Sequence, residues 1–156
     1  MKNIFSLLII ACFAAGCALN LATGRNQLSL VNESELQLMA TSQYNTFLAE
    51  NKILSSGTSK DAATVDRVGA RISNAITKYY AQQGKESILE GYKWEFNLLE
   101  DKQVNAWAMP GGKVVVYTGI LPITKDETGL AVVIAHEVAH AIARHGSERM
   151  SQGLIA

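Results

Sequence analysis

Residues 130–145 read LAVVIAHEVAHAIARH, and this segment is the most informative part of the 156-residue chain. At 100° per residue, its apolar side chains would cover most of the circumference of a helix, which predicts a buried helix. His136 and His140 would lie about 40° apart, and Glu137 about 100° from His136. Arg144 would fall on the same narrow arc. An unpaired buried carboxylate costs several kcal/mol, so Glu137 is expected to have a partner.

The spacing of the two histidines suits a metal site. Side chains four residues apart share one helix face, so both imidazoles can bind one Zn²⁺ at ~2.0–2.1 Å. Glu137 is angled away from direct ligation and can take a proton from the zinc-bound water as it attacks a peptide carbonyl. The sequence predicts one catalytic Zn²⁺ with His136 and His140 as ligands and Glu137 as base. The alternative is two core histidines that backbone groups satisfy.

Two further helices are expected before this one. Asn32 and Glu35 form a capping box at the start of the first, and apolar residues recur at helical spacing after it. A second apolar stripe runs from about Ala62 to Gln83, where Gly84 is expected to end the helix. In the last helix, Thr124-x-x-Glu127 is a capping box, which predicts a helix over about residues 125–145.

Between these helices the period of the pattern changes from helical to alternating. Residues 92–98 alternate aromatic or apolar with polar side chains, which predicts a half-buried strand. Residues 104–109 and 113–118 are two more expected strands, joined by a turn at 110–112. The sequence therefore predicts an α+β fold, with N-terminal helices, a small antiparallel sheet or hairpin and a long buried helix.

The first 31 residues are expected to export and anchor the chain. Residues 1–16 combine a positive start with an apolar run too short to span a membrane, as a signal peptide does. They end in Ala-Ala-Gly, and Cys17 follows, as in a bacterial lipobox whose cysteine is acylated; an ordinary secretory signal is the alternative. Residues 17–31 are polar and lack a period, so they are expected to be a tether, with a peptidase domain over 32–156.

The composition excludes some functions. Lys plus Arg and Asp plus Glu each number 14, so there is no basic field to attract nucleic acid. Of the two cysteines, Cys12 lies in the expected signal peptide and Cys17 is the expected lipid site, which leaves none for a disulfide. Ala18 follows Cys17, and resemblance to sorted lipoproteins then favours the periplasmic side of the outer membrane.

Three segments resemble the HtpX-like zinc metallopeptidases, family 48 of the metallopeptidases. They are NAWAMPGG at 105–112, VVVYTGI at 114–120 and the histidine-containing segment at 130–146. The lipobox and the NQL at 26–28 resemble the periplasmic BepA-like quality-control branch. The resemblance implies a zincin-like fold, zinc-dependent cleavage of unfolded or misfolded periplasmic or outer-membrane proteins, and the roles given above to His136, Glu137 and His140.

The resemblance also implies a substrate-binding segment. In the family, the segment that matches residues 105–117 lies beside the active-site cleft, where an extended substrate could pair with a strand edge. Asn105, Ala106, Gly111 and Gly112 are the expected contacts. A simple hairpin turn is the alternative for the two glycines.

One departure from the family pattern bears on activity. The family takes its third zinc ligand from a Glu on a later helix, and the sequence to Ala156 contains no matching segment, whereas catalytic zinc normally has three protein ligands. The resemblance therefore predicts a truncated peptidase, incomplete at its C-terminus and impaired in cleavage. Two other functions stay open: a non-catalytic lipoprotein that binds misfolded clients or assembly partners, and a structural lipoprotein with incidental histidines.

Three polar residues after the second histidine are expected to lie outside the metal site. On a continuous helix His145 would lie about 140° from His140, facing away from the metal. Glu148 would lie about 12 Å along the axis from His140, too far for a third ligand. Both are predicted to be surface or structural residues, and Arg144 to form an ion pair or face solvent near the cleft.

Overall fold

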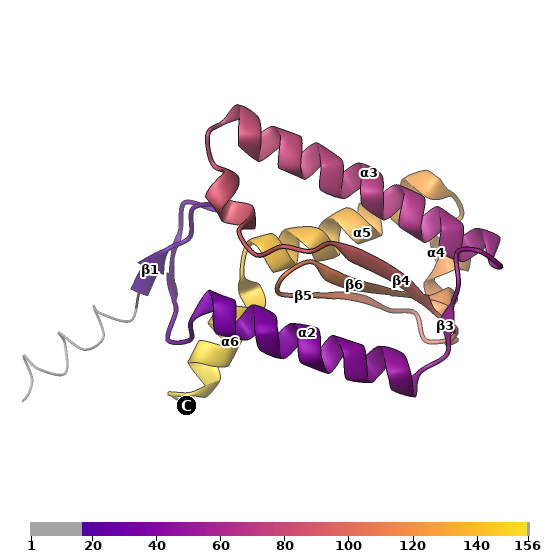
Figure 1. The fold of residues 1–156 in the computed structure, drawn as a ribbon, viewed down its shortest axis with the longest axis horizontal. Helices are drawn as coiled ribbons and strands as arrows, with labels where there is room; N and C mark the ends of the chain where they lie inside the picture. The colour runs from indigo at the N-terminus through magenta and orange to yellow at the C-terminus, as the bar shows by residue number, and fades with distance from the viewer. Residues whose placement is uncertain (1–16, 156) are drawn as a thin grey trace, which may run out of the picture.

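A four-stranded sheet forms the centre of the computed structural model, which describes residues 17–155 (Figure 1). The strand order is β3 (Ile53–Leu54), β4 (Glu95–Leu99), β6 (Lys113–Tyr117) and β5 (Ala106–Met109). The predicted signal peptide lies outside the described residues. Within them, no helix is both long enough and apolar enough to cross a membrane.

The sheet is mixed, so the prediction of an antiparallel sheet is wrong for one pair of strands. β5 and β6 form the expected antiparallel hairpin, but β4 runs parallel to β6. All five residues of β6 are buried, because this strand lies between two others and is covered on both faces. A strand with this much apolar surface belongs at the centre of a sheet, which places β5 at the edge.

Two long helices flank the sheet, α2 (Glu33–Glu50) and α3 (Lys60–Gln82). The predicted caps are confirmed in part: the Asn32 side chain caps α2, but it accepts a hydrogen bond from the N–H of Ser34. Gly84 follows α3 with φ +63°, a conformation that glycine adopts without steric cost. The α+β fold class is confirmed.

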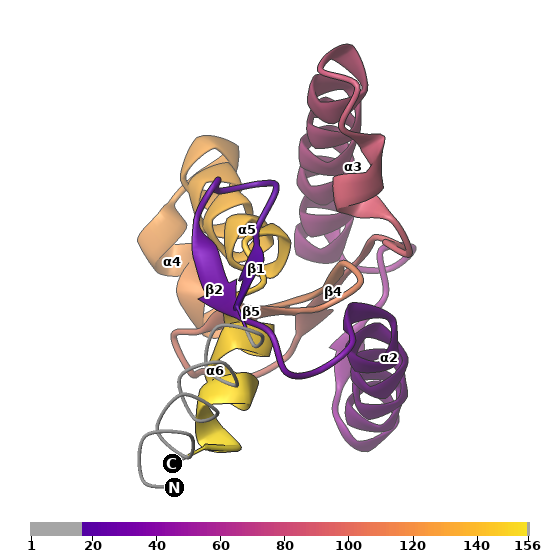
Figure 2. The same cartoon turned by 90° about the vertical axis from the view of Figure 1, so that its left-hand side faces the viewer.

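Side chains of the central strand alternate between two apolar clusters. Val114 and Val116 pack with α3 and α5 (Glu127–Ile142), whereas Val115 and Tyr117 pack with α2. Figures 1 and 2 show the resulting layers, with α2 on one face of the sheet and α3 and α5 on the other. The segment that carries the predicted zinc ligands thus forms one wall of the main core.

The predicted helix over about residues 125–145 is not continuous, and a further short helix precedes it. α4 (Leu121–Thr124), α5 and α6 (His145–Gly153) are separated at Lys125 and Arg144, which both have positive φ. Asp126 caps α5 by accepting a hydrogen bond from the N–H of Gly129. The capping box at Thr124 is therefore wrong, because the aspartate side chain stands directly before the helix and takes this place.

α5 is also less buried than its composition predicts. Leu130, Ile134 and Val138 are in the core, but Val132 is 66 % exposed and His136 is exposed. Apolar side chains around the whole circumference therefore do not mean burial on every side. The helix has one open face, and the histidines lie on it.

The expected tether differs from the structure. β1 (Cys17–Leu19) and β2 (Asn26–Leu28) form an antiparallel pair, which Figure 2 shows beside α5 and α6. The buried side chains of this segment are polar: Asn20, directly after β1, and Gln27 in β2 are each 4 % exposed and hydrogen-bonded to one another. A pair of strands that buries polar side chains has no apolar alternation, so the sequence gives no signal for it.

Candidate active site

The three residues of the predicted zinc site lie together on α5. The Nε2 atoms of His136 and His140 face each other at 3.0 Å, as the one-turn spacing requires. His136 is exposed, and His140 and Glu137 are partly buried. Glu137 forms no ion pair with any residue in the range 17–155.

The paired nitrogens suit two ligand positions of a zinc ion. Two nitrogens at 2.0–2.1 Å from a tetrahedral zinc are about 3.3–3.4 Å apart, so a small rotation of either ring satisfies both bonds. The described residues contain no group of three His, Cys, Asp or Glu side chains that could hold a metal. Within residues 17–155 the donor set is therefore the histidine pair.

His145 lies against the metal site, contrary to the prediction that it faces away. Its Nδ1 is 2.6 Å from Nδ1 of His140. The prediction assumed a continuous helix, whereas α5 ends at Ile142 and the chain turns at Arg144, with φ +55°, before α6. Burial lowers the pKa of His145 below its ordinary value, and the neighbouring His140 contributes a smaller decrease.

Side chains from distant segments hold this turn between α5 and α6. The amide nitrogen of Asn20 donates to the carbonyl of Ala143 at 2.8 Å, and the hydroxyl of Tyr92 donates to the carbonyl of Ala141 at 2.9 Å. Burial raises the pKa of Tyr92 well above its usual range, which keeps this donor protonated. The bond from Asn20 gives the carbonyl of Ala143 a partner, and Tyr92 adds a second donor to the carbonyl of Ala141, which also accepts from the N–H of Arg144.

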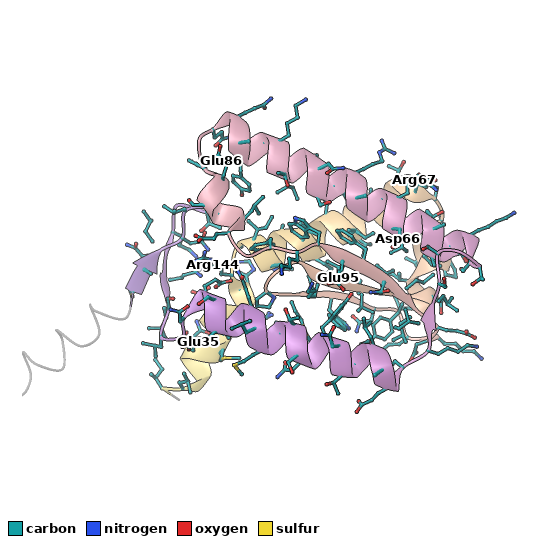
Figure 3. The ribbon with its side chains drawn as sticks, in the orientation of Figure 1. Glu35, Asp66, Arg67, Glu86, Glu95 and Arg144 are labelled. Carbon is teal, nitrogen blue, oxygen red and sulfur yellow. The ribbon has the colours of Figure 1, made fainter. Side chains whose placement is uncertain are left out.

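The charged residues near the turn form ion pairs. Arg144 pairs with Glu33 at 3.5 Å, as its predicted role allows, and Figure 3 shows it beside the N-terminal end of α2. Glu148 pairs with Arg25 at 2.5 Å, which agrees with the structural role predicted for it. The N-terminal strands and α2 thus both fix the segment that carries His145.

The predicted substrate-binding residues lie on the β5–β6 hairpin. Asn105 and Ala106 are at the start of β5, the edge strand, which packs against α5. Gly111 and Gly112 form the turn, with φ +81° and +85°, so the turn interpretation is confirmed for them. A Cβ atom on Gly112 would lie 2.8 Å from Cε3 of Trp94, which explains why this position has no side chain.

Sequence reasoning missed His145 and Asn20 as residues of this region. A turn into the left-handed region usually shows itself by a glycine, but Arg144 occupies that position here. Asn20 and Ala143 are separated by 123 positions, so no local pattern links them. Cys17, the predicted lipid site, is exposed at the start of β1.

Comparison with known proteins identifies a family and several relatives of this chain. The model of peptidase family M48 matches residues 67–156. The mitochondrial metalloendopeptidase OMA1 of Schizosaccharomyces pombe is 42% identical over 80 residues, 51% of this chain and 23% of that protein. OMA1 of Bos taurus is 28% identical over 149 residues, 94% of this chain and 27% of that protein. The beta-barrel assembly-enhancing protease of Yersinia pestis is 37% identical over 59 residues, 38% of this chain and 12% of that protein.

These matches confirm the family and leave its branch open. They include mitochondrial and bacterial proteases, so the resemblance to the periplasmic branch stays a prediction. The chain spans about a quarter of the length of the OMA1 proteins described above. Metalloendopeptidases of the family are zinc-dependent, which agrees with a catalytic zinc at the histidine pair. Because the family model matches more than half of the sequence, the chain belongs to peptidase family M48.

Proposed function

We propose that this chain provides the zinc-binding helix and the substrate-binding edge of a metalloendopeptidase. The observation that carries the proposal is the pair of Nε2 atoms 3.0 Å apart on the open face of α5, with Glu137 next to one of them. Membership of the M48 family supports it.

His136 and His140 would hold the metal through their Nε2 atoms. A bound zinc ion supplies a Lewis acid for the peptide carbonyl and lowers the pKa of its water toward 7. Glu137 takes the proton of the attacking water and delivers it to the leaving amine. The open face of α5 gives a protein substrate access to these side chains.

The edge of β5 would hold the substrate in an extended conformation. The N–H of Tyr117 donates to the carbonyl of Asn105 at 3.1 Å. Hydrogen-bonded pairs alternate along antiparallel strands, so Trp107 also faces β6, while Ala106 and Ala108 direct their backbone groups outward. The small side chains of these alanines pack on the cluster that contains α5. Their free N–H and C=O groups can add a substrate strand beside the metal-binding helix.

Replacing Ala108 by proline tests this binding edge. The substitution removes one outward N–H and no hydrogen bond to β6, and edge strands tolerate proline with that orientation. Loss of one substrate hydrogen bond is expected to lower kcat/KM about 2–10-fold with little change in stability. The control is Trp107→Pro, which removes a bond to β6 and is expected to lower the unfolding midpoint in urea. Unchanged peptide cleavage by a folded Ala108→Pro chain would rule out this edge.

We propose that the substrates are misfolded periplasmic or outer-membrane proteins. We also propose that a lipid attached to Cys17 anchors this chain. The support is the lipobox-like sequence, the exposed position of Cys17 and the similarity to a beta-barrel assembly-enhancing protease. Acylation would give the full chain two physical signatures, partition into the detergent phase and added mass at Cys17. A chain from a bacterial host that stays aqueous and carries an unmodified cysteine contradicts the anchor.

Zinc stoichiometry and casein cleavage test the function itself. The chain is expected to bind one Zn²⁺ at the histidine pair. Because residues 17–155 supply two zinc ligands, casein cleavage is expected to be weak, to be lost with a chelator and to return when Zn²⁺ is added back. Client binding without cleavage would instead support the non-catalytic lipoprotein. Absence of zinc binding would support a structural protein, and the peptidase proposal would then be abandoned.

A further inference from the structure

The two ring nitrogens of His140 have different neighbours. Nε2 faces Nε2 of His136 at 3.0 Å, and Nδ1 lies 2.6 Å from Nδ1 of His145. A neutral imidazole has one N–H and one lone pair, so the partner of one nitrogen decides what the other can do. Only the tautomer with the proton on Nδ1 leaves the Nε2 lone pair available for a metal.

We propose that His145 is a positioning residue for the metal site. Its Nδ1 accepts the Nδ1–H of His140, which directs the Nε2 lone pair of His140 to the metal. This inference rests on the proposed function, since it concerns how the same site is prepared for zinc. A metal-binding histidine usually donates the N–H of its other ring nitrogen to a carboxylate, a carbonyl or water. Here the acceptor is the imidazole of His145.

The geometry separates this role from that of a third ligand. The lone-pair directions of Nδ1 and Nε2 diverge in an imidazole ring, and His145 is on the Nδ1 edge of His140 whereas His136 is on the Nε2 edge. A nitrogen in contact with the outer edge of His140 cannot at the same time join the Nε2 pair. His145 therefore acts through His140.

The turn before α6 brings His145 into this position. Arg144 has φ +55°, a conformation that costs energy for a residue with a side chain and is retained where surrounding contacts fix it. Those contacts come from Glu33, which pairs with Arg144, and from Asn20, which donates to Ala143. A helix that continued past Ile142 would carry His145 away from His140.

Two substitutions and a control test the proposal on the full chain. His145→Leu keeps most of the volume and removes the acceptor. His145→Asn places Oδ1 close to the position of Nδ1 and restores an acceptor. Arg149→Gln changes an exposed residue of the same helix and is the control. Each chain is first compared with wild type by its thermal unfolding.

The first measurement is the ¹⁵N shift of the His140 ring nitrogens in metal-free protein. We expect a proton on Nδ1 in wild type, a shift toward the Nε2–H form in His145→Leu and recovery in His145→Asn. Loss of packing alone would not exchange the two nitrogens in this way. An Nε2–H form in wild type, or an unchanged tautomer in His145→Leu, overturns the proposal, and the wild-type result needs no variant to fold.

The second measurement is the Zn²⁺ dissociation constant, from competition with a chromophoric chelator. We expect it to rise 10–100-fold in His145→Leu, to return to within a few-fold of wild type in His145→Asn and to stay unchanged in Arg149→Gln. Equal affinity in wild type and His145→Leu overturns the inference while the peptidase proposal stands. Wild type that binds no Zn²⁺ removes the peptidase proposal, and the tautomer measurement still decides the role of His145.

Discussion

Glu137→Gln is expected to lower kcat for cleavage of a casein-derived peptide about 10²–10⁴-fold, the usual contribution of a general base. Glutamine has nearly the same shape as glutamate but accepts no proton at neutral pH. Glu137 lies beside the histidine pair and is not one of the proposed zinc ligands. The Zn²⁺ dissociation constant is therefore expected to stay within about threefold of the wild-type value. KM should change little, since the carboxylate acts in the transition state.

Glu127→Gln is the matched control, since it makes the same chemical change on the same helix. Glu127 begins α5, pairs with Arg67 on the surface and is far along the helix from His136. Exposed ion pairs contribute little to stability, so its cleavage rate should remain close to that of wild type. Cleavage that persists in Glu137→Gln and disappears when Zn²⁺ is chelated would assign the base to another group.

The local parts of this site could be predicted from the sequence. Two histidines four residues apart share a helix face whatever the rest of the fold does, so the nitrogen pair follows from helical geometry alone. The apolar run of β6 and the glycine turn before it are equally local signals. These features need only the nearest residues along the chain, and the structure has each of them.

The remaining parts depend on contacts between distant segments. Alternation identifies a strand but not its direction, so nothing in the sequence shows that β4 is parallel to β6. The turn at Arg144 depends on Glu33 and Asn20, which lie more than a hundred positions earlier. The contact between His145 and His140 therefore could not be predicted from helical periodicity, which assumes a continuous helix.

Gly112→Ala is expected to produce a large loss of stability. The residue has φ +85°, and a side chain in that region costs about 1–3 kcal/mol. Its Cβ would also lie 2.8 Å from Cε3 and 3.3 Å from Cα of Trp94. The second contact is with backbone, which cannot rotate away, so overpacking adds about 1–3 kcal/mol. The combined loss of about 2–6 kcal/mol is a large part of the 5–15 kcal/mol that stabilises a typical domain.

Gly111→Ala provides the comparison that separates the two costs. Gly111 has a similar φ of +81°, but its Cβ would lie 3.5 Å from side-chain atoms of Gln37 and 4.0 Å from its Cα, which are ordinary contacts. We therefore expect about 1–3 kcal/mol for this variant, from the backbone term alone, when both are measured by urea unfolding. Equal losses for the two variants would show that Trp94 does not restrict the turn. Loss of peptide cleavage in a stable Gly111→Ala chain would instead support the direct role in substrate binding that the family resemblance implies for these glycines.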